Sequence, residues 1–243
     1  AFKNNTSQIA FAAGKDIAGK PIIADIAKMP HLLIAGATGS GKSTILSLIV
    51  RNYDIQKGEI LIDDIDIKKI DIKCLRNKIG QMLQDVFIFS GTILDNITLF
   101  DQTISLQDVN NAIKYVNADK FILKMKDGLN TEVSEKGSNF SSGQRQLISF
   151  SRTIVHNPQI LILDEATANI DTETEALIQD SLEKMKNIGT MLIVAHRLST
   201  IQHADNIICL AKGKILEQGN HQQLLSKKGY YYKLYLLQFE KNI

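Results

Sequence analysis

The sequence predicts an α/β fold built on a mainly parallel core sheet, with a small antiparallel β portion and an inserted helical subdomain. Short, unbroken apolar runs at 31–35, 160–163 and 190–195 are typical of strands buried on both faces, as in a parallel sheet covered by helices. Elsewhere apolar residues recur at helical spacing, for example from Leu106 to Val116. Ligands of open α/β folds bind at the carboxyl edge of the sheet, so residues directly after each run are candidates for function.

Composition places the chain among globular proteins with a full-sized core. It has 243 residues, 44% hydrophobic and 22% charged, which suits one or two domains. The net charge of +2 gives no sign of a strongly basic nucleic-acid surface. No apolar run approaches the roughly 20 residues of a membrane span, and no secretory signal begins the sequence. We interpret Cys74 and Cys209 as reduced structural residues of a cytosolic protein, with a disulfide or a metal role as the alternatives.

The first half of the chain is expected to mix short strands with helices. Glycines and a proline punctuate residues 1–30, which indicates short strands and turns, one of them opening at Pro21. Two short apolar segments flank Asp63-Asp64 within 58–67, which predicts an antiparallel hairpin. The other elements expected here are a strand at 31–35, helices at 44–51 and 71–78, a strand at 79–83, and helical segments within 92–126.

The second half is expected to complete the sheet. A helix is predicted after Phe140, a buried strand at 160–163 and a helix at about 172–186. The strand at 190–195 follows, and a hairpin turns at Gly213 between 206–210 and 214–217. The tail is expected to be helical, with an aromatic stripe that serves as packing surface.

Residues 36–43, Gly-Ala-Thr-Gly-Ser-Gly-Lys-Ser, match the phosphate-binding P-loop pattern between a predicted strand and a predicted helix. Glycines let backbone N–H groups close around phosphate oxygens, and the helix N-terminus adds its positive dipole end. Lys42 is expected to reach the β- and γ-phosphates, and Ser43 to bind Mg²⁺. The predicted nucleotide contacts of this segment are Gly36, Ala37, Thr38, Gly39, Ser40, Gly41, Lys42, Ser43 and Thr44. The motif and its context predict a P-loop NTPase fold.

Other polar residues are expected at the same edge of the sheet. Asp164 and Glu165 follow the strand at 160–163, so that one can hold a metal while the other faces a reacting water. The alternative is a strand that ends in solvated acids. His196 follows the strand at 190–195, where a lone histidine is more often structural.

Ser141, Ser142, Gly143 and Gln144 precede a helix and are interpreted as a second anion-binding helix end. An ordinary N-cap is the alternative for these residues.

From about residue 45 onward the chain resembles the nucleotide-binding domain of an exporter-type ABC transporter. Gln84 matches the Q-loop of that family, and residues 140–146 match its signature motif, with Phe140 for the usual Leu and Ser142 for the usual first Gly. Asp164-Glu165 matches the Walker B acid and catalytic glutamate. Residues 168–171 match the D-loop, His196 the H-loop, and residues 132–137 the X-loop that faces the membrane domain. The resemblance covers about four-fifths of the sequence.

The resemblance implies an ATPase in which two such domains associate head to tail. Each ATP would lie between the P-loop of one domain and Ser141–Gln144 of the other, with Asp171 also near the nucleotide. Ser43 and Gln84 would bind Mg²⁺, and Asp164 would act through water. Glu165 would polarise the attacking water, and His196 would hold the γ-phosphate. The implied partners are membrane domains of an exporter, at the cytoplasmic face of the membrane, and no nucleic acid is expected.

Residues 1–43 carry a different resemblance. Gly14–Pro21 and Ala27–Ser43 are similar to the ATPase motor of an FtsK-type DNA translocase, which suggests an engineered chimera within one domain. The expected layout is 1–43 translocase-like, 44–89 and 156–243 ABC-like core, and about 90–155 helical subdomain. A divergent natural ABC domain, a folded scaffold with little activity and a DNA translocase are the alternatives.

Overall fold

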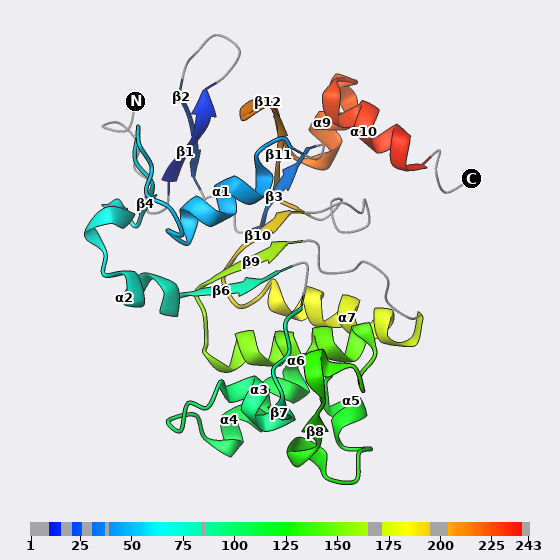
Figure 1. Cartoon of the computed structure of the whole chain (residues 1–243). Helices are drawn as coiled ribbons and strands as arrows, with labels where there is room; N and C mark the ends of the chain where they lie inside the picture. Colours follow the sequence, from blue (N-terminus) through cyan, green and yellow to red (C-terminus); the bar gives the residue numbers. More distant parts are fainter. Residues whose placement is uncertain are drawn as a thin grey trace. The chain divides into compact units, whose positions relative to one another are not determined.

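Figure 1 presents a computed structural model of the chain. The structure describes residues 10–15, 21–25, 31–36, 39–83, 86–164, 172–194 and 204–239. The chain forms two compact units, the first with residues 1–79, 162–164 and 190–243, the second with residues 80–161 and 165–189. The boundaries drawn from the sequence, including the helical subdomain at about 90–155, stay a prediction.

Six strands form one sheet in the order β12-β11-β3-β10-β9-β6. Strand β3 pairs in parallel with β10 and with β11, whereas β11 pairs antiparallel with β12. The bounds are His31–Ala35 (β3), Ile79–Met82 (β6), Ile160–Asp164 (β9), Thr190–Val194 (β10), Asn206–Ala211 (β11) and Lys214–Gly219 (β12). This mostly parallel sheet, together with the helical segments below, confirms the predicted α/β P-loop NTPase fold.

The apolar runs read from the sequence are the buried strands of this sheet. In β3, Leu32, Leu33 and Ile34 are at most 1% exposed. Residues 160–163 of β9 and 191–194 of β10 are buried as well. Unbroken burial, rather than alternation, is what a strand covered on both faces requires.

Two short antiparallel pairs accompany the sheet in the first unit. Strands β1 (Ala10–Lys15) and β2 (Pro21–Asp25) pair with each other, and β2 opens at the proline as predicted. Strands β4 (Leu61–Ile62) and β5 (Ile65–Asp66) pair across a turn at Asp63 and Asp64, whose φ angles are 50° and 60°. These pairs confirm the predicted small antiparallel portion.

Among the described residues of the first unit, five helical segments accompany these strands. They are α1 (Lys42–Ile49), the 3₁₀ turn η3 (Ile67–Lys69), α2 (Ile72–Asn77), α9 (His221–Lys227) and α10 (Tyr230–Phe239). Glu217 of β12 accepts hydrogen bonds from the backbone N–H groups of Tyr230 and Tyr231, at 2.7 and 2.9 Å. A carboxylate at a helix N-terminus is favourable, so this contact holds α10 against β12. Tyr231 is 1% exposed, and burial raises the pKa of its hydroxyl.

The two cysteines are not joined in a disulfide. Cys74 of α2 is exposed, and Cys209 lies buried in β11. Burial, with a smaller contribution from Glu217, raises the pKa of the Cys209 thiol to about 12. A buried neutral thiol is the behaviour of a small core residue, in line with the structural role predicted for it.

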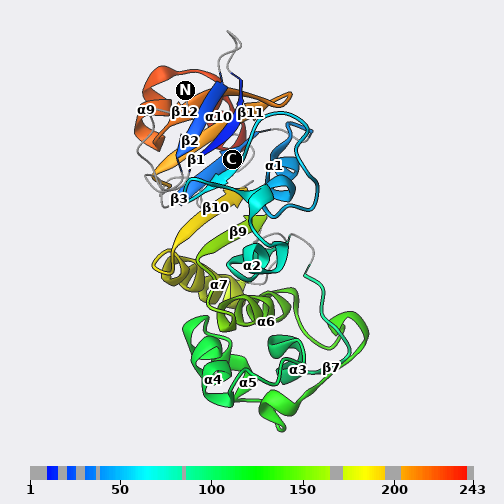
Figure 2. The same cartoon turned by 90° about the vertical axis from the view of Figure 1, so that its left-hand side faces the viewer.

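The second unit is mainly helical. Its elements are α3 (Ile93–Thr98), α4 (Leu106–Tyr115), α5 (Asp119–Ile122), α6 (Ser142–Val155), α7 (Thr172–Met185), the 3₁₀ turns η4 (Gly128–Asn130) and η5 (Glu135–Gly137), and the paired strands β7 (Gly91–Thr92) and β8 (Glu132–Val133). Helix α6 packs against α3, α4 and α7 (Figures 1 and 2). Among the helices of the described residues, none combines the length and apolarity that crossing a membrane requires.

Candidate phosphate-binding site

Because of the register of the parallel strands, the carboxyl ends of β3, β10 and β11 lie at the same edge of the sheet. In parallel pairing, Ile34 of β3 lies opposite Val194 of β10, and Ala35 lies opposite Cys209 of β11. The P-loop therefore begins where β10 ends, next to the last residues of β11. Strand β9, the neighbour of β10, ends at Asp164 in the same compact unit. This is the carboxyl edge at which ligands of open α/β sheets bind.

The described part of the P-loop is tightly packed. A Cβ atom at Gly36 would overlap the backbone oxygen of Leu210, so the loop can approach β11 only with glycine there. Gly41 is the N-cap of α1 and has a φ of 101°, a conformation that favours glycine. The two glycines thus serve close approach and a left-handed turn, as a phosphate loop needs.

The N-terminus of α1 presents backbone donors. Its N-cap residue, Gly41, provides no side-chain cap, and its first turn contains no acidic residue. Ser43 and Thr44, in this first turn, are exposed. A helix N-terminus with uncapped N–H groups carries a partial positive charge and is suited to an anion such as phosphate.

Lys42 adds a full positive charge inside the loop. The residue is 6% exposed, and its ammonium donates a hydrogen bond to the backbone oxygen of Gly36. The side chain therefore folds back across the loop rather than extending into solvent. Phosphate binding by this ammonium stays a prediction.

Ser40 connects the loop to a distant part of the chain. Its side chain is buried, and its Oγ has no hydrogen-bond partner among the described atoms. Its backbone oxygen accepts a hydrogen bond from the N–H of Gly213, at 2.9 Å. The turn at Gly213 is predicted from the sequence, but its contact with the P-loop is not.

The donors near the loop have the chemistry that Mg²⁺ prefers. Ser43 offers a hydroxyl and Asp164 a carboxylate, both hard oxygen ligands. Within the described ranges no cluster of three His, Cys, Asp or Glu side chains is present. Mg²⁺ usually keeps several waters and binds through one or two protein oxygens plus substrate phosphates, so this small donor set fits it.

In the second unit, Ser141 begins helix α6 with a reciprocal cap. Its side chain accepts a hydrogen bond from Gln144 N–H, and the Gln144 side chain accepts one from Ser141 N–H. The ordinary N-cap offered as the alternative is therefore present. The anion contact predicted for this segment stays a prediction. Ser142 and Gly143 form the first turn behind this cap.

Six predicted site residues lie outside the described residues. They are Ala37, Thr38, Gln84, Glu165, Asp171 and His196. Their roles stay predictions.

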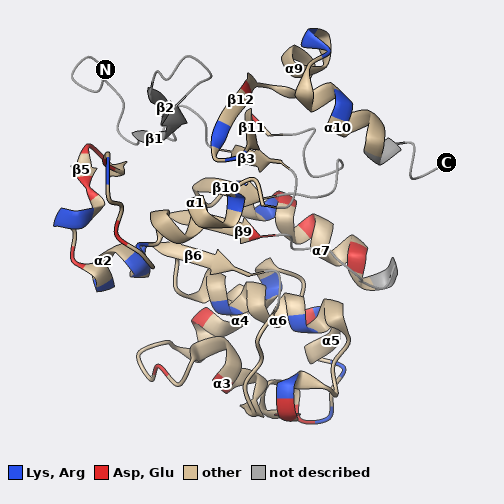
Figure 3. Ribbon diagram, turned by 45° about the horizontal axis from the view of Figure 1, so that its top comes forward, with Lys and Arg blue, Asp and Glu red and all other residues tan. Residues whose placement is uncertain are grey.

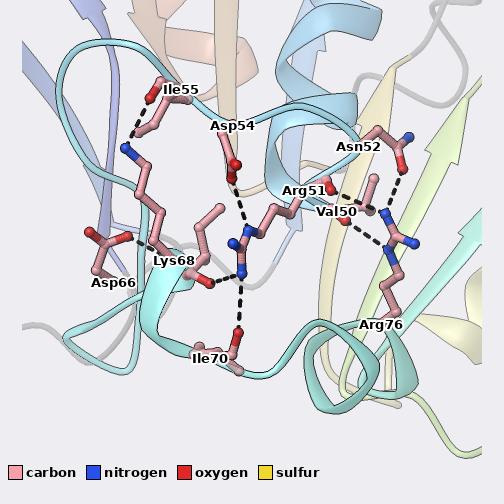
Figure 4. Close-up of polar contacts among 10 residues, drawn as sticks. Val50, Arg51, Asn52, Asp54, Ile55, Asp66, Lys68, Ile70 and Arg76 are labelled. Carbon is pink, nitrogen blue, oxygen red and sulfur yellow. Dashed lines mark hydrogen bonds and ion pairs between the residues drawn. The ribbon is translucent and has the colours of Figure 1, made fainter.

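Two arginines hold the opposite end of α1, and sequence reasoning missed them (Figure 4). Arg51 donates to the backbone oxygens of Ile67 and Ile70, both at 3.2 Å, and to Asp54 at 3.0 Å. Arg76 of α2 donates to the backbone oxygens of Val50 and Arg51, at 3.3 and 3.1 Å. Cations near a helix C-terminus complement its dipole, so these contacts both anchor and stabilise α1.

The segment that these arginines tie to α1 carries charges of both signs. Figure 3 shows both acidic and basic positions along β5 and α2. The charged residues from β5 through η3 to α2 include Asp66, Lys68, Asp71 and Arg76. Lys68 donates to the backbone oxygen of Ile55 at 2.9 Å, and Asp66 caps η3 by accepting from the N–H of Lys68. Side chains of this segment therefore bind backbone groups both within the segment and in residues 50–55.

A buried parallel strand that leads through a glycine-rich Lys-Ser loop into a helix, with an aspartate ending a second strand of the sheet, defines a P-loop NTPase. Residues 20–168 match the ABC transporter family. The chain belongs to this family, as a nucleotide-binding domain of the exporter type.

Curated bacterial relatives support the assignment. The chain is 50% identical over 205 residues to the probable multidrug resistance ABC transporter ATP-binding/permease protein YheH of Bacillus subtilis, covering 84% of this chain and 30% of that protein. It is 48% identical over 222 residues to the putative ABC transporter ATP-binding protein exp8 of Streptococcus pneumoniae, covering 90% of this chain and 38% of that protein. The chain thus spans about a third of the length of these relatives.

A solved structure agrees in fold. The structure of a bacterial Atm1-family ABC exporter with ATP bound matches with a TM-score of 0.82 and 36% identity, covering 96% of this chain and 41% of that one.

The translocase-like resemblance of residues 1–43 finds no support. The ABC transporter match starts at residue 20 and so includes the segment from Pro21 to Ser43. The solved exporter covers 96% of the chain. None of these comparisons supports an FtsK-like segment or an engineered chimera, and the ABC family accounts for β2, β3 and the P-loop together.

Proposed function

We propose that this domain binds Mg-ATP at the P-loop and hydrolyses it to ADP and phosphate. The observation that carries the proposal is the uncapped N-terminus of α1 with the buried Lys42 ammonium folded over the loop. Backbone donors and one internal cation suit the β- and γ-phosphates. Membership of the ABC family supports ATP as the nucleotide.

Hydrolysis would depend mainly on positioning and charge. Mg²⁺, held by Ser43 and Gln84 with Asp164 acting through water, would neutralise charge on the phosphates. Glu165 would accept a proton from the attacking water, and His196 would hold the γ-phosphate. Ser141–Gln144 and Asp171 of a second domain would complete each site in a head-to-tail dimer.

The whole protein is proposed to be an exporter. YheH is called a probable multidrug resistance ABC transporter ATP-binding/permease protein, and the match covers 30% of YheH and 38% of exp8. We infer that membrane domains are the partners, that this domain lies at the cytoplasmic face, and that dimer closure and opening move them.

Binding is tested by calorimetry of Mg-ATP with the parent chain and with Lys42→Ala. We expect the variant to lose at least tenfold in affinity, because charge-assisted contacts to phosphate are strong. Lys57→Ala removes an exposed lysine from the same unit and should bind like the parent. Equal affinity for the parent and Lys42→Ala would show that the loop does not bind phosphate as proposed.

Hydrolysis is tested with Glu165→Gln. We expect turnover to fall by about 10²–10⁴ while Mg-ATP affinity stays within threefold of the parent, because the amide keeps the shape and loses the base. Phosphate release under saturating Mg-ATP measures turnover. Activity within threefold of the parent would remove Glu165 from its proposed role.

A further inference from the structure

The turn between β11 and β12 lies against the phosphate loop at two places. At the start of the loop, the backbone oxygen of Leu210 fills the space that a Cβ at Gly36 would need. At its end, the N–H of Gly213 donates to the backbone oxygen of Ser40 at 2.9 Å, and a Cβ at Gly41 would meet the Cα of Gly213 at 3.7 Å. A segment about 170 residues further along the chain therefore forms one wall of the loop.

The hairpin has the backbone geometry of a tight two-residue turn. Ala211 pairs with Lys214, and the two residues between them, Lys212 and Gly213, have φ angles of 50° and 71°. Positive φ at both central residues is typical of a type I′ turn, which matches the twist of the strands it joins. This conformation turns the N–H of Gly213 toward Ser40.

Holding the Ser40 carbonyl also fixes an amide of the loop. The peptide that joins Ser40 to Gly41 is planar and trans, since the described residues contain no cis peptide bond. In such a peptide the C=O and the N–H point in opposite directions. Because Gly213 holds the Ser40 oxygen toward the hairpin, the N–H of Gly41 points away from the hairpin.

We propose that Gly213 is a positioning residue for the phosphate site, acting through the Ser40–Gly41 peptide to aim the Gly41 N–H at bound phosphate. The inference rests on the proposed function, because it assigns this amide to the phosphates of Mg-ATP. Gly213 makes no contact with nucleotide itself. Its contribution is to keep one donor oriented before the ligand arrives, so that binding needs no reorganisation of the peptide.

Gly213→Ala and Gly58→Ala form a matched pair. Both glycines have positive φ, 71° and 87°, and a Cβ at either meets nothing within 4 Å. Alanine strains both backbones similarly, and relief of that strain at position 213 rotates the peptide that carries the N–H to Ser40. Both variants should lose similar thermal stability. Only Gly213→Ala should weaken Mg-ATP binding, by about tenfold, as expected for one misdirected donor.

Gly213→Asn provides the rescue. Asparagine tolerates positive φ better than alanine and retains the backbone N–H, so its affinity for Mg-ATP should stay within threefold of the parent. A purely structural role for the turn predicts instead that affinity follows the melting temperature across the three variants.

Amide hydrogen exchange tests the contact without any substitution. In the parent chain without nucleotide, the Gly213 N–H should exchange at least tenfold more slowly than the N–H of Lys212, its neighbour in the exposed turn. On addition of Mg-ATP, the Gly41 amide resonance should shift in the parent and in Gly213→Asn, and shift less in Gly213→Ala.

The outcomes separate the two proposals. A parent chain that does not bind Mg-ATP overturns the proposed function and this inference with it. A parent that binds, with unchanged affinity in folded Gly213→Ala, overturns the inference alone. If Gly213→Ala does not fold, hydrogen exchange in the parent decides. A Gly213 amide that is not protected from exchange overturns the inference. A protected Gly213 amide, together with the shift of the Gly41 resonance on addition of Mg-ATP, supports it.

Discussion

In the helical unit, the buried side chain of Asn96 hydrogen-bonds to the backbone before α3 and to a side chain of α6. It is 1% exposed, and its Oδ1 accepts from Phe89 N–H at 2.8 Å and from Arg152 at 3.0 Å. Its Nδ2 donates to the backbone oxygens of Phe89 and Thr92, at 2.8 and 3.0 Å. The amide therefore satisfies the backbone of the segment before α3 and one guanidinium of α6 at once. Burial lowers the pKa of Arg152, because the guanidinium is partly removed from water at this contact.

We predict that Asn96→Ala destabilises the chain by about 2–4 kcal/mol, because several buried partners lose their hydrogen bonds together. Urea denaturation followed by circular dichroism measures the change. Asn111→Ala is the control, since Asn111 is exposed on α4 and its amide oxygen accepts only from Gln107 among the hydrogen bonds described. The control should stay within about 0.5 kcal/mol of the parent. Equal effects in the two variants would contradict a special role for Asn96.

At the scale of elements, α1 is held at both ends by contacts from outside the helix. Its N-terminus continues the P-loop, and its C-terminus receives Arg51 and Arg76 (Figure 4). The helix has only eight residues, too few for stable helix formation in isolation. Tertiary contacts therefore decide its position, and through it the position of Lys42 and Ser43.

We predict that Arg51→Met destabilises the chain by about 1–3 kcal/mol, because the oxygens of Ile67 and Ile70 lose their shared donor. Arg51→Lys keeps the charge but not the planar fork, so it should lose about half as much. Denaturant unfolding gives both values. Lys68→Met removes a neighbouring exposed cation with a single backbone contact and should cost at most about 0.5 kcal/mol. An Arg51→Met variant as stable as Lys68→Met would contradict the anchoring role.

At the scale of the whole molecule, the proposed head-to-tail dimer matters most, because a second domain would complete each nucleotide site. Helix α6 begins with a Ser141 cap, and helix α4 begins with a Ser105 cap of the same kind, with Asp108 in place of Gln144. The two serines accept from the corresponding backbone N–H at 3.2 and 3.1 Å. One cap is proposed to contact the nucleotide of a partner, and the other is not.

We predict that Ser141→Ala and Ser105→Ala each lose about 1 kcal/mol of stability, as is usual when an N-cap is removed. In the hydrolysis-deficient Glu165→Gln background, Mg-ATP should produce a dimer in analytical ultracentrifugation. Ser141→Ala should weaken that dimer by at least tenfold, because a partner's phosphate loses a donor. Ser105→Ala should leave it unchanged. Parallel loss in both variants would indicate that helix capping, and not nucleotide contact, sets dimer strength.

The fold class and most strands and helices of the described residues could be predicted from the sequence alone, and so could the position of the P-loop motif between β3 and α1. These depend on short-range information: unbroken apolar runs for the buried strands, helical spacing for α4 and α6, and a contiguous eight-residue motif for the loop. The family resemblance from residue 45 onward was also correct. The translocase-like interpretation of residues 1–43 finds no support, because the ABC transporter match already begins at residue 20. The resemblance arose because this segment contains the P-loop, a motif that several NTPase families share.

The contacts around the P-loop could not be predicted from the sequence and became visible only in the folded chain. Gly213 contacts Ser40, Leu210 excludes a side chain at Gly36, and Arg51 reaches Ile70; none of these pairs shares a motif or a periodicity. Such contacts arise from sheet register and from the path of the chain between elements. A linear pattern encodes which residues form a strand or turn, but not which distant backbone oxygen that turn will face.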